Sequence, residues 1–337
     1  MKLSTNLQRL HNRTAYYTWI GVFVLIIFLT IGTIYFATRQ IDYVWRWYKV
    51  PDYFVYQDDI EIQAEVEGDV TAIDAGSRAL TIQVKESDGN IETYKSPSDG
   101  EILVSEGDMI YPGDTLATYK RWKPGIMLQG LWITLKVSVY AIALGIVIGL
   151  IGGVSRISSN PALKWTSMAY VELIRGSPLL VQIFIWYFVL GTLVNSLLAK
   201  HGMTQLSPLW FGVIALAVFT GAYVTEIVRA GIQSIHRGQI EASRSLGMSY
   251  TQSMRHVILP QAMRRILPPL AGQFISLIKD SSLLGIIAVR ELTKATREVI
   301  TTSLQPFELF FTCAVLYLIL TFTLSMAVQY MERRMAR

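Results

Sequence analysis

A lysine and an aspartate stand side by side inside an apolar run of this sequence. Lys279 and Asp280 occur within "LPPLAGQFISLIKDSSLLGIIAV", whose other residues are typical of a membrane-spanning helix. A charge in hydrocarbon costs at least a few kcal/mol unless it faces a partner or a wet cavity. Three interpretations stay open. The two charges form structural ion pairs, they lie at the outer end of a shorter span, or they line a path for a polar solute with the hydroxyls of Ser281 and Ser282.

Two further charge pairs occur at the spacing that puts both members on one face of a helix. Glu226 and Arg229 lie near the end of an apolar stretch, and form either a structural pair or part of a gate. Glu172 and Arg175 precede "GSP", which predicts a broken helix. Unwound backbone at membrane depth is tolerated only beside protein or a cavity, so the break either borders a path or is a simple kink. The candidate pathway residues are therefore Arg175, Ser177, Glu226, Lys279, Asp280, Ser281 and Ser282.

The sequence lacks the residue groups that enzymes need. The single cysteine, Cys313, excludes a disulfide framework and a thiolate metal site. No Gly-x4-Gly-Lys-Ser/Thr motif is present, so the chain does not hydrolyse ATP by that route. We predict no catalytic residue, no bound cofactor and no metal. The histidines fall in predicted loops or helix ends and are read as surface residues: His11, His201, His236 and His256.

Composition indicates a membrane protein. Hydrophobic residues make up 52% of the 337-residue chain and charged residues only 16%, against roughly 25% charged in soluble domains. The apolar residues gather in blocks of about 20, the length of a membrane span. Residues 285–304 either re-enter the membrane or lie along its surface. The six predicted spans are Thr18–Ala37, Leu128–Ile151, a segment within Trp165–Leu198, Leu209–Ile232, a span that begins near Pro260, and Phe307–Tyr330.

Charge orients these spans. Residues 40–125 contain 17 acidic and 8 basic side chains, a net of −9, which leaves +14 for the rest of a chain whose total is +5. Basic residues favour the cytoplasmic side of short loops. The loop at Arg156 and Lys164, the six arginines between residues 229 and 265, and the arginine-rich C-terminus all fall on one side if six spans cross. We therefore place both termini in the cytoplasm and residues 39–125 outside. The basic pI of 9.1 reflects this orientation rather than nucleic-acid binding.

The segment between the first two spans has the patterning of a small all-β domain. "ALTIQVKE" alternates apolar and polar residues, and "SDGN", "SPSDG", "EGD" and "YPGD" supply turns. The piece "SPSDGEILVSEGDMIYPGDTLATYK" resembles a half-motif of biotinyl/lipoyl-type barrel-sandwich domains. Such domains carry their cofactor on a lysine within Asp-Lys-Ala or Met-Lys-Met, and neither pattern surrounds Lys85 or Lys95. We read the insert as a packing module or a docking surface for a soluble partner.

The stretch "GQIEASRSLGMSYTQSMRHVILPQA" after the fourth span predicts two short amphipathic helices. We expect Glu241 in the first turn of a helix, where a carboxylate suits the positive end of the dipole. Ala242 and Ser243 are small, which lets another protein approach the backbone closely. Gly247 offers a helix stop, and Pro260 suits the first turn of the next span.

The spacing of this stretch resembles the signature of the membrane permeases of binding-protein-dependent ABC importers. That signature is Glu-Ala-Ala, three residues, Gly, nine residues and Ile-x-Leu-Pro. Here Ser replaces the second Ala and Val replaces Ile. "YVELIRGSPLLVQIFIWYF" and "SLIKDSSLLGIIAV" are similar to permeases that import polar amino acids. The resemblance covers roughly residues 129–337 and leaves the first span and the insert unexplained. The signature residues are Glu241, Ala242, Ser243, Gly247, Leu259 and Pro260.

The patterning of the whole chain and the resemblance of its second part together predict an all-α multi-spanning membrane protein with a small all-β extracytoplasmic insert. Residues 1–17 form a cytoplasmic N-terminus, 18–38 an extra anchor helix, 39–125 the insert and 126–337 a five-span ABC type I importer core with a coupling loop at 233–260. The implied function is import of polar amino acids across the prokaryotic cytoplasmic (inner) membrane. The implied partners are a cytosolic ABC ATPase dimer that uses ATP and Mg, a second permease (identical or paralogous) and an extracytoplasmic solute-binding protein.

The resemblance also assigns roles within the path. The signature loop inserts into the ATPase. Asp280 pairs with the ammonium of the solute, while Ser281, Ser282 and backbone amides at a helix break hold its carboxylate. Lys279 points about 100° away from Asp280 on a helix and packs elsewhere. Alternatives are a permease of the same type for another small solute, an efflux adaptor with one anchor helix, or a secondary transporter. An adaptor lacks five further spans, and a secondary transporter needs no ATPase-docking loop.

Overall fold

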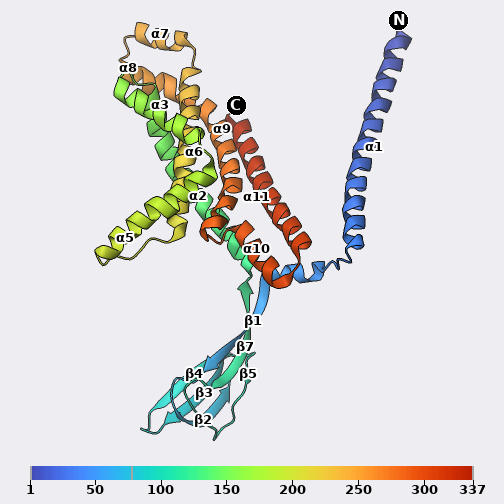
Figure 1. Cartoon of the computed structure of the whole chain (residues 1–337), viewed down its shortest axis with the longest axis vertical. Helices are drawn as coiled ribbons and strands as arrows, with labels where there is room; N and C mark the ends of the chain where they lie inside the picture. The colour runs from blue at the N-terminus through green and yellow to red at the C-terminus, as the bar shows by residue number, and fades with distance from the viewer. Residues whose placement is uncertain (1, 77–78, 336–337) are drawn as a thin grey trace. The chain divides into compact units, whose positions relative to one another are not determined.

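The computed structural model describes residues 2–76 and 79–335 and divides after Trp47 into two units. The first unit is dominated by α1 (Lys2–Gln40), a 39-residue helix (Figure 1). Its stretch Ala15–Gln40 is long and apolar enough to cross a membrane and contains the predicted first span. Thr30 and Thr33 donate their hydroxyls to carbonyls one turn back, at 2.8 and 2.7 Å. These two hydroxyls are thus satisfied within the helix, as a lipid environment requires.

The second unit begins with seven strands after the short 3-10 helix η1 (Trp47–Tyr53). They form two small antiparallel sheets, ordered β1-β7-β5 and β4-β3-β2-β6. In β3 the side chains of Leu80, Ile82 and Val84 alternate inward and are buried, as the "ALTIQVKE" pattern predicts. The strands are β1 (Val55–Gln63), β2 (Gly68–Ala75), β3 (Ala79–Glu86), β4 (Ile91–Pro97), β5 (Glu101–Ile102), β6 (Met109–Ile110) and β7 (Thr115–Pro124).

Two turns of this β segment share one design. Gly107 and Gly113 adopt φ of 91° and 99°, a region that glycine enters without steric cost. The following Asp108 and Asp114 each accept a hydrogen bond from the backbone N–H three residues earlier, at 2.7 and 2.8 Å. The "EGD" and "YPGD" signals therefore produce equivalent side-chain-closed turns.

The β segment is joined tightly to the first helix that follows it. Gly125 donates its N–H to the carbonyl of Phe54 at 2.6 Å. A Cβ at Gly125 would lie 2.2 Å from the carbonyl oxygen of Tyr53, so only glycine allows this approach. Tyr53 and Phe54 then pack with Met127 at the start of α2. The strand ribbon β1–β7 is thus fixed to the end of the helical part.

The rest of the second unit is helical (Figure 1). Its elements are α2 (Ile126–Arg156), α3 (Pro161–Arg175), α4 (Leu179–Phe184), the π-helical η2 (Ile185–Gly191), α5 (Thr192–Lys200), α6 (Pro208–Gln233), α7 (Arg237–Ser245), α8 (Tyr250–Ser253), the π-helical η3 (Met254–Ile258), α9 (Leu259–Asp280), the 3-10 helix η4 (Ser281–Ile287), α10 (Leu292–Ser303) and α11 (Pro306–Met335).

Helices α2 and α6 form the tightest pair because glycines line their contact. A Cβ at Gly149 or Gly153 of α2 would lie 2.3 or 2.5 Å from a valine Cγ1 of α6. Such small residues let helix backbones approach closely where no hydrophobic effect drives association, as in a membrane. The buried core nearby is built from α2, α4, α6, α9 and η4, with Val137, Ile183 and Leu277 among its members.

Within the described residues, six helical stretches are long and apolar enough to cross a membrane, and each predicted span overlaps one of them. The third stretch is Leu179–Lys200, which follows the separate 15-residue helix α3 and lies within the predicted Trp165–Leu198 except for its last two residues. The fifth is a helical run from Tyr250 to Ile287, within which α9 begins at Leu259, next to the predicted Pro260. The wide π-helical turn η3 ends just before Pro260, which provides room for the ring and for the carbonyl that lacks a donor.

The segment 285–304, left open by the sequence, contains α10. This helix has 12 residues, too few to span a membrane. One face, which includes Leu292, Ala295 and Val299, is buried. The N–H of Leu292 donates to the Thr134 hydroxyl on α2 at 3.0 Å. Helix α10 is therefore a short amphipathic helix that packs on α2.

Candidate functional site

The α7–α8 hairpin (residues 237–253) carries most of the signature residues. Helix α7 starts at Arg237, with His236 as its N-cap: His236 Nδ1 accepts from the N–H of Gly238 at 3.1 Å. Glu241 therefore lies in the second turn, and its predicted place in the first turn is wrong. Histidine is not among the preferred capping residues, so the sequence did not reveal the true start.

Gly247 ends α7 as predicted. It adopts φ of 76°, its N–H donates to the Arg244 carbonyl at 2.9 Å, and the N–H of Met248 donates to Ser243 at 3.2 Å. These two bonds are those of a Schellman motif, which satisfies carbonyls at the helix end.

The two small residues of the signature have different surroundings. Ala242 is exposed, as a docking residue requires. Ser243 is buried, with its hydroxyl bonded to the Ile240 carbonyl and to the Ser253 hydroxyl of α8. The expectation that Ser243 offers a close approach to another protein is wrong. Its side chain joins the two helices of the hairpin instead.

The outer surface of the hairpin presents two large apolar side chains. Leu246 is 82% exposed and Tyr250 is 63% exposed. Glu241 and Arg244 are exposed beside them. The hairpin therefore shows an apolar tip with charged neighbours, a composition typical of a docking surface. Leu259 and Pro260, the last signature residues, lie where the helical run enters α9.

Lys279 and Asp280 differ in exposure. Asp280 is half-buried, and among the described residues it has no hydrogen-bond or ion-pair partner. Lys279 is exposed and lines a cavity of about 310 Å³ with Ser282, Thr293 and Tyr317. Ser281 is fully buried, and its hydroxyl donates to the Ile278 carbonyl at 2.7 Å. Of the two serines, only Ser282 is free for another partner.

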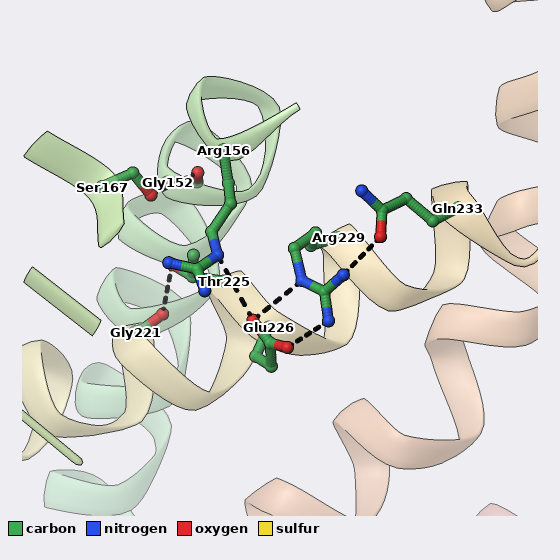
Figure 2. A network of polar contacts seen from close by, with 8 residues as sticks. All are labelled: Gly152, Arg156, Ser167, Gly221, Thr225, Glu226, Arg229 and Gln233. Carbon is green, nitrogen blue, oxygen red and sulfur yellow. Dashed lines mark hydrogen bonds and ion pairs between the residues drawn. The ribbon is translucent and has the colours of Figure 1, made fainter. Parts of the chain in front are cut away.

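Glu226 and Arg229 form the predicted pair, within a larger network (Figure 2). Arg229 Nε donates to Glu226 Oε2 at 3.0 Å, and its Nη1 contacts the side-chain oxygen of Gln233. Arg156, at the end of α2, places Nε 3.6 Å from the same Oε2. Glu226 thus lies between two guanidinium groups and ties α2 to α6 at the end nearest the hairpin. This geometry is that of an ion-paired network between the two helices.

Glu172 and Arg175 do not pair among the described residues, although their spacing is the same. The Arg175 guanidinium carbon lies 5.1 Å from the Tyr223 ring centroid on α6, in a cation–π contact. The predicted break follows: α3 ends at Arg175, and α4 begins at Leu179. The Ser177 hydroxyl donates to the Leu173 carbonyl at 2.9 Å and accepts from Gln182 at 2.8 Å.

Two functional candidates were missed by sequence reasoning. Glu291 is fully buried and caps α10, accepting from the N–H groups of Thr293 and Lys294 at 2.7 Å each. The Tyr317 hydroxyl of α11 donates to the same carboxylate at 3.0 Å. Gln182 is buried in α4. Gln182 lies within the quoted stretch "YVELIRGSPLLVQIFIWYF", but its role depends on a carbonyl eight residues earlier, and glutamate is not a favoured N-cap, so sequence reasoning singled out neither residue.

Comparison with known proteins gives these features a family. Residues 142–337 match the model of the family described as "binding-protein-dependent transport system inner membrane component". The probable glutamine ABC transporter permease protein GlnM of Bacillus subtilis (strain 168) is 40% identical over 210 residues, which cover 62% of this chain and 93% of that protein. The glutamine transport system permease protein GlnP of Escherichia coli (strain K12) is 39% identical with the same coverage.

A solved structure agrees with the relatives. The crystal structure of an amino acid ABC transporter with histidines is 38% identical, with a TM-score of 0.55, and the match covers 62% of this chain and 94% of that chain. The ATPase of such a system is a separate subunit, and this chain is a non-enzymatic, multi-pass membrane subunit. It belongs to the family of binding-protein-dependent transport system inner membrane components, the permease subunits of ABC transporters.

Proposed function

We propose that this chain is the permease of an importer that takes up polar amino acids, with glutamine as the first solute to test. The observation that carries the proposal is the 39–40% identity to two glutamine permeases across 93% of their length. The amino acid ABC transporter of known structure supports the same solute class. The chain forms the solute path, and energy comes from ATP, with Mg, bound by the partner ATPase.

The α7–α8 hairpin is the proposed contact with that ATPase. Its exposed tip at Leu246 and Tyr250 would fill a groove on the partner, and Ala242 leaves the backbone of α7 accessible. The hydrogen bond between the hydroxyls of Ser243 and Ser253 holds α7 and α8 together. A displacement of the exposed tip by the ATPase therefore moves both helices. Glu241, Gly247, Leu259 and Pro260 complete the loop as shaping residues.

Asp280 is the proposed anchor for the solute ammonium. Its carboxylate is half-buried and has no partner in the described residues, so a bound cation would relieve the cost of burying it. Ser282 and Lys279 face the adjacent cavity and are left to hold the solute carboxylate. Ser281 acts only through the backbone, since its hydroxyl is already used. Arg175, Ser177 and Glu226 shape the path without touching the solute.

The membrane arrangement is part of the proposal. Residues 18–38 form an extra anchor helix, both termini are cytoplasmic, and residues 39–125 form an extracytoplasmic, barrel-sandwich-like insert. The alternating strands and paired turns of the insert support this fold. The partners are an ATPase dimer, an identical or paralogous permease and an external solute-binding protein.

Uptake by a reconstituted complex tests the function. The full chain would be co-expressed with the ATPase and the binding protein encoded beside it, and placed in liposomes with ATP inside. We expect ATP-dependent uptake of glutamine or another polar amino acid. Uptake driven by an ion gradient without ATP would refute the proposal, and so would uptake of a solute of another class with none of the twenty amino acids.

Matched substitutions test the site. Asp280→Asn keeps the shape but removes the charge, and losing a charged hydrogen bond of about 1.5–3 kcal/mol should raise the KM roughly 10- to 100-fold. Asp99→Asn, the same change in an exposed turn of the insert, is its control and should leave the KM unchanged. An unchanged KM in Asp280→Asn would remove Asp280 from the path.

Cysteine labelling tests the orientation. Cys313→Ser provides a cysteine-free background. In sealed cells, a cysteine replacing Ser245 should resist an impermeant reagent, and one replacing Ser87 in the insert should react. The reverse result would contradict the arrangement.

A further inference from the structure

The broken helix between α3 and α4 lacks a backbone donor that a helix would supply. In an α-helix the carbonyl of residue i accepts from the N–H of residue i+4. For Ile174 that residue is Pro178, which has no N–H. The carbonyl of Ser177 also lacks a backbone N–H donor in the described part of the chain, because the helix is interrupted there. A bare carbonyl at membrane depth costs several kcal/mol, so another group must satisfy it.

Gln182 supplies the missing donor. Its side-chain Nε2 lies 2.7 Å from the Ile174 carbonyl oxygen, 3.2 Å from the Ser177 carbonyl oxygen and 2.8 Å from the Ser177 hydroxyl. The Ser177 hydroxyl in turn donates to Leu173 at 2.9 Å. One glutamine and one serine thereby replace the helical bonds lost on both sides of the break.

The orientation of this amide follows from its neighbours. All three atoms near Nε2 are oxygens, two of them carbonyls that only accept, so the NH₂ group must face them. The Oε1 atom then points away, is buried and has no hydrogen-bond partner in the described residues. Gln182 as a whole is only 5% exposed. Within the described residues, the hydrogen bonds that hold this side chain are therefore all donated by its NH₂ group.

We call the three hydrogen bonds of the Gln182 amide the Gln182 clamp. This clamp also determines where the break lies relative to the segment that carries Asp280. The next residue, Ile183, is fully buried and packs in one core with Leu277 of α9 and Leu284 of η4. Asp280 lies between those two leucines in the sequence. Gln182 and Ile183 therefore connect the broken helix to the walls around Asp280 through adjacent positions of α4.

We propose that Gln182 is a positioning residue for solute transport: its amide substitutes for the N–H that Pro178 lacks, and so holds the broken helix against the segment of Asp280. The inference rests on the proposed function. Gln182 does not touch the solute; it fixes the geometry of the path, and a permease without this clamp binds its solute less well.

The test compares three variants of the full complex in liposomes. Gln182→Leu keeps an apolar side chain in the buried position but offers no donor to the two carbonyls. We expect the KM for the solute to rise at least about tenfold, as expected for a lost hydrogen bond with a buried partner. Gln205→Leu, in an exposed loop, is the control and should leave the KM unchanged. Rates are normalised to the amount of assembled complex.

The third variant keeps the test valid if Gln182→Leu fails to assemble. Pro178→Ala restores a backbone N–H for Ile174, so Pro178→Ala with Gln182→Leu should assemble again, while uptake stays low because the break has been lost. Failure of this rescue would overturn the inference. A native KM in Gln182→Leu would overturn it as well. If the unmodified complex takes up no amino acid at all, the proposed function fails, and the assembly and rescue measurements still judge the clamp.

Discussion

Truncation of Leu246 provides a direct measure of how the hairpin docks. The side chain is 82% exposed and makes no core contact, so Leu246→Ala should leave the chain folded. If the tip enters a groove on the ATPase, the smaller side chain of alanine cannot fill that groove. The loss should then appear in association with the ATPase and not in the stability of the chain.

The magnitude follows from the exposed fraction. Alanine lacks three carbons of leucine, which at about 0.8 kcal/mol per buried CH₂ amount to roughly 2.4 kcal/mol. Since 82% of the leucine is free to become buried, we expect a loss of about 2 kcal/mol. That loss raises the dissociation constant of the ATPase roughly 30-fold.

Titration of fluorescent ATPase with the solubilised chain measures this constant. Leu304→Ala is the matched control: Leu304 is 78% exposed and follows α10, which lies at the other end of the helical part from α7 (Figure 1). The reasoning is refuted if Leu246→Ala binds the ATPase as tightly as the native chain. It is also refuted if Leu304→Ala weakens binding equally.

Three other outcomes follow from the packing and the charges. Gly149→Ala should destabilise the chain by about 1–3 kcal/mol through overpacking, whereas Gly272→Ala, with open space around its Cβ, should stabilise it by up to about 1 kcal/mol; thermal unfolding in detergent compares them. Gly247→Val should weaken ATPase binding more than Gly247→Asn, because a branched side chain at φ of 76° is strained and asparagine tolerates that region. The hydrogen bond from Lys123 to Asp58 raises the pKa of the lysine, so the pair stabilises the insert at neutral pH and that effect is lost as the pH rises through the raised pKa. The difference in urea midpoint between native and Asp58→Asn chains should therefore vanish at strongly alkaline pH.

The elements that could be predicted are those with local signals. Apolar blocks gave all six spans, and the φ of Gly247 agrees with its predicted role as a helix stop. Prolines predict boundaries in two places, and the structure differs between them. A new helix, α4, begins directly after Pro178, whereas at Pro260 the helical run continues into α9 through the π-helical turn η3. Composition does not reveal which of the two arrangements a proline produces.

Side-chain partners were less predictable because they depend on neighbouring helices. Glu226–Arg229 and Glu172–Arg175 have the same spacing, yet only the first pair forms. Arg175 contacts Tyr223 of α6 instead. Ser243 was misplaced for the same reason, since the choice between solvent and α8 is made by the fold of the hairpin. Sequence spacing limits which residues can meet on one helix but says nothing about competitors on the next.

The helix breaks share one physical feature that links fold to transport. Each interruption leaves backbone donors or acceptors without helical partners. Among the described residues, side chains outside the usual capping set satisfy such groups at three breaks: Gln182, His236 and Glu291. A glutamine or glutamate reaches farther than serine or aspartate, so it can satisfy a break and contact a second element, as Glu291 does with Tyr317. A break held in this way keeps its shape without a continuous helix. If Asp280 lines the solute path as we propose, breaks held at Gln182 and Glu291, before and after it in the sequence, let that path expose polar groups to a solute without unfolding around them.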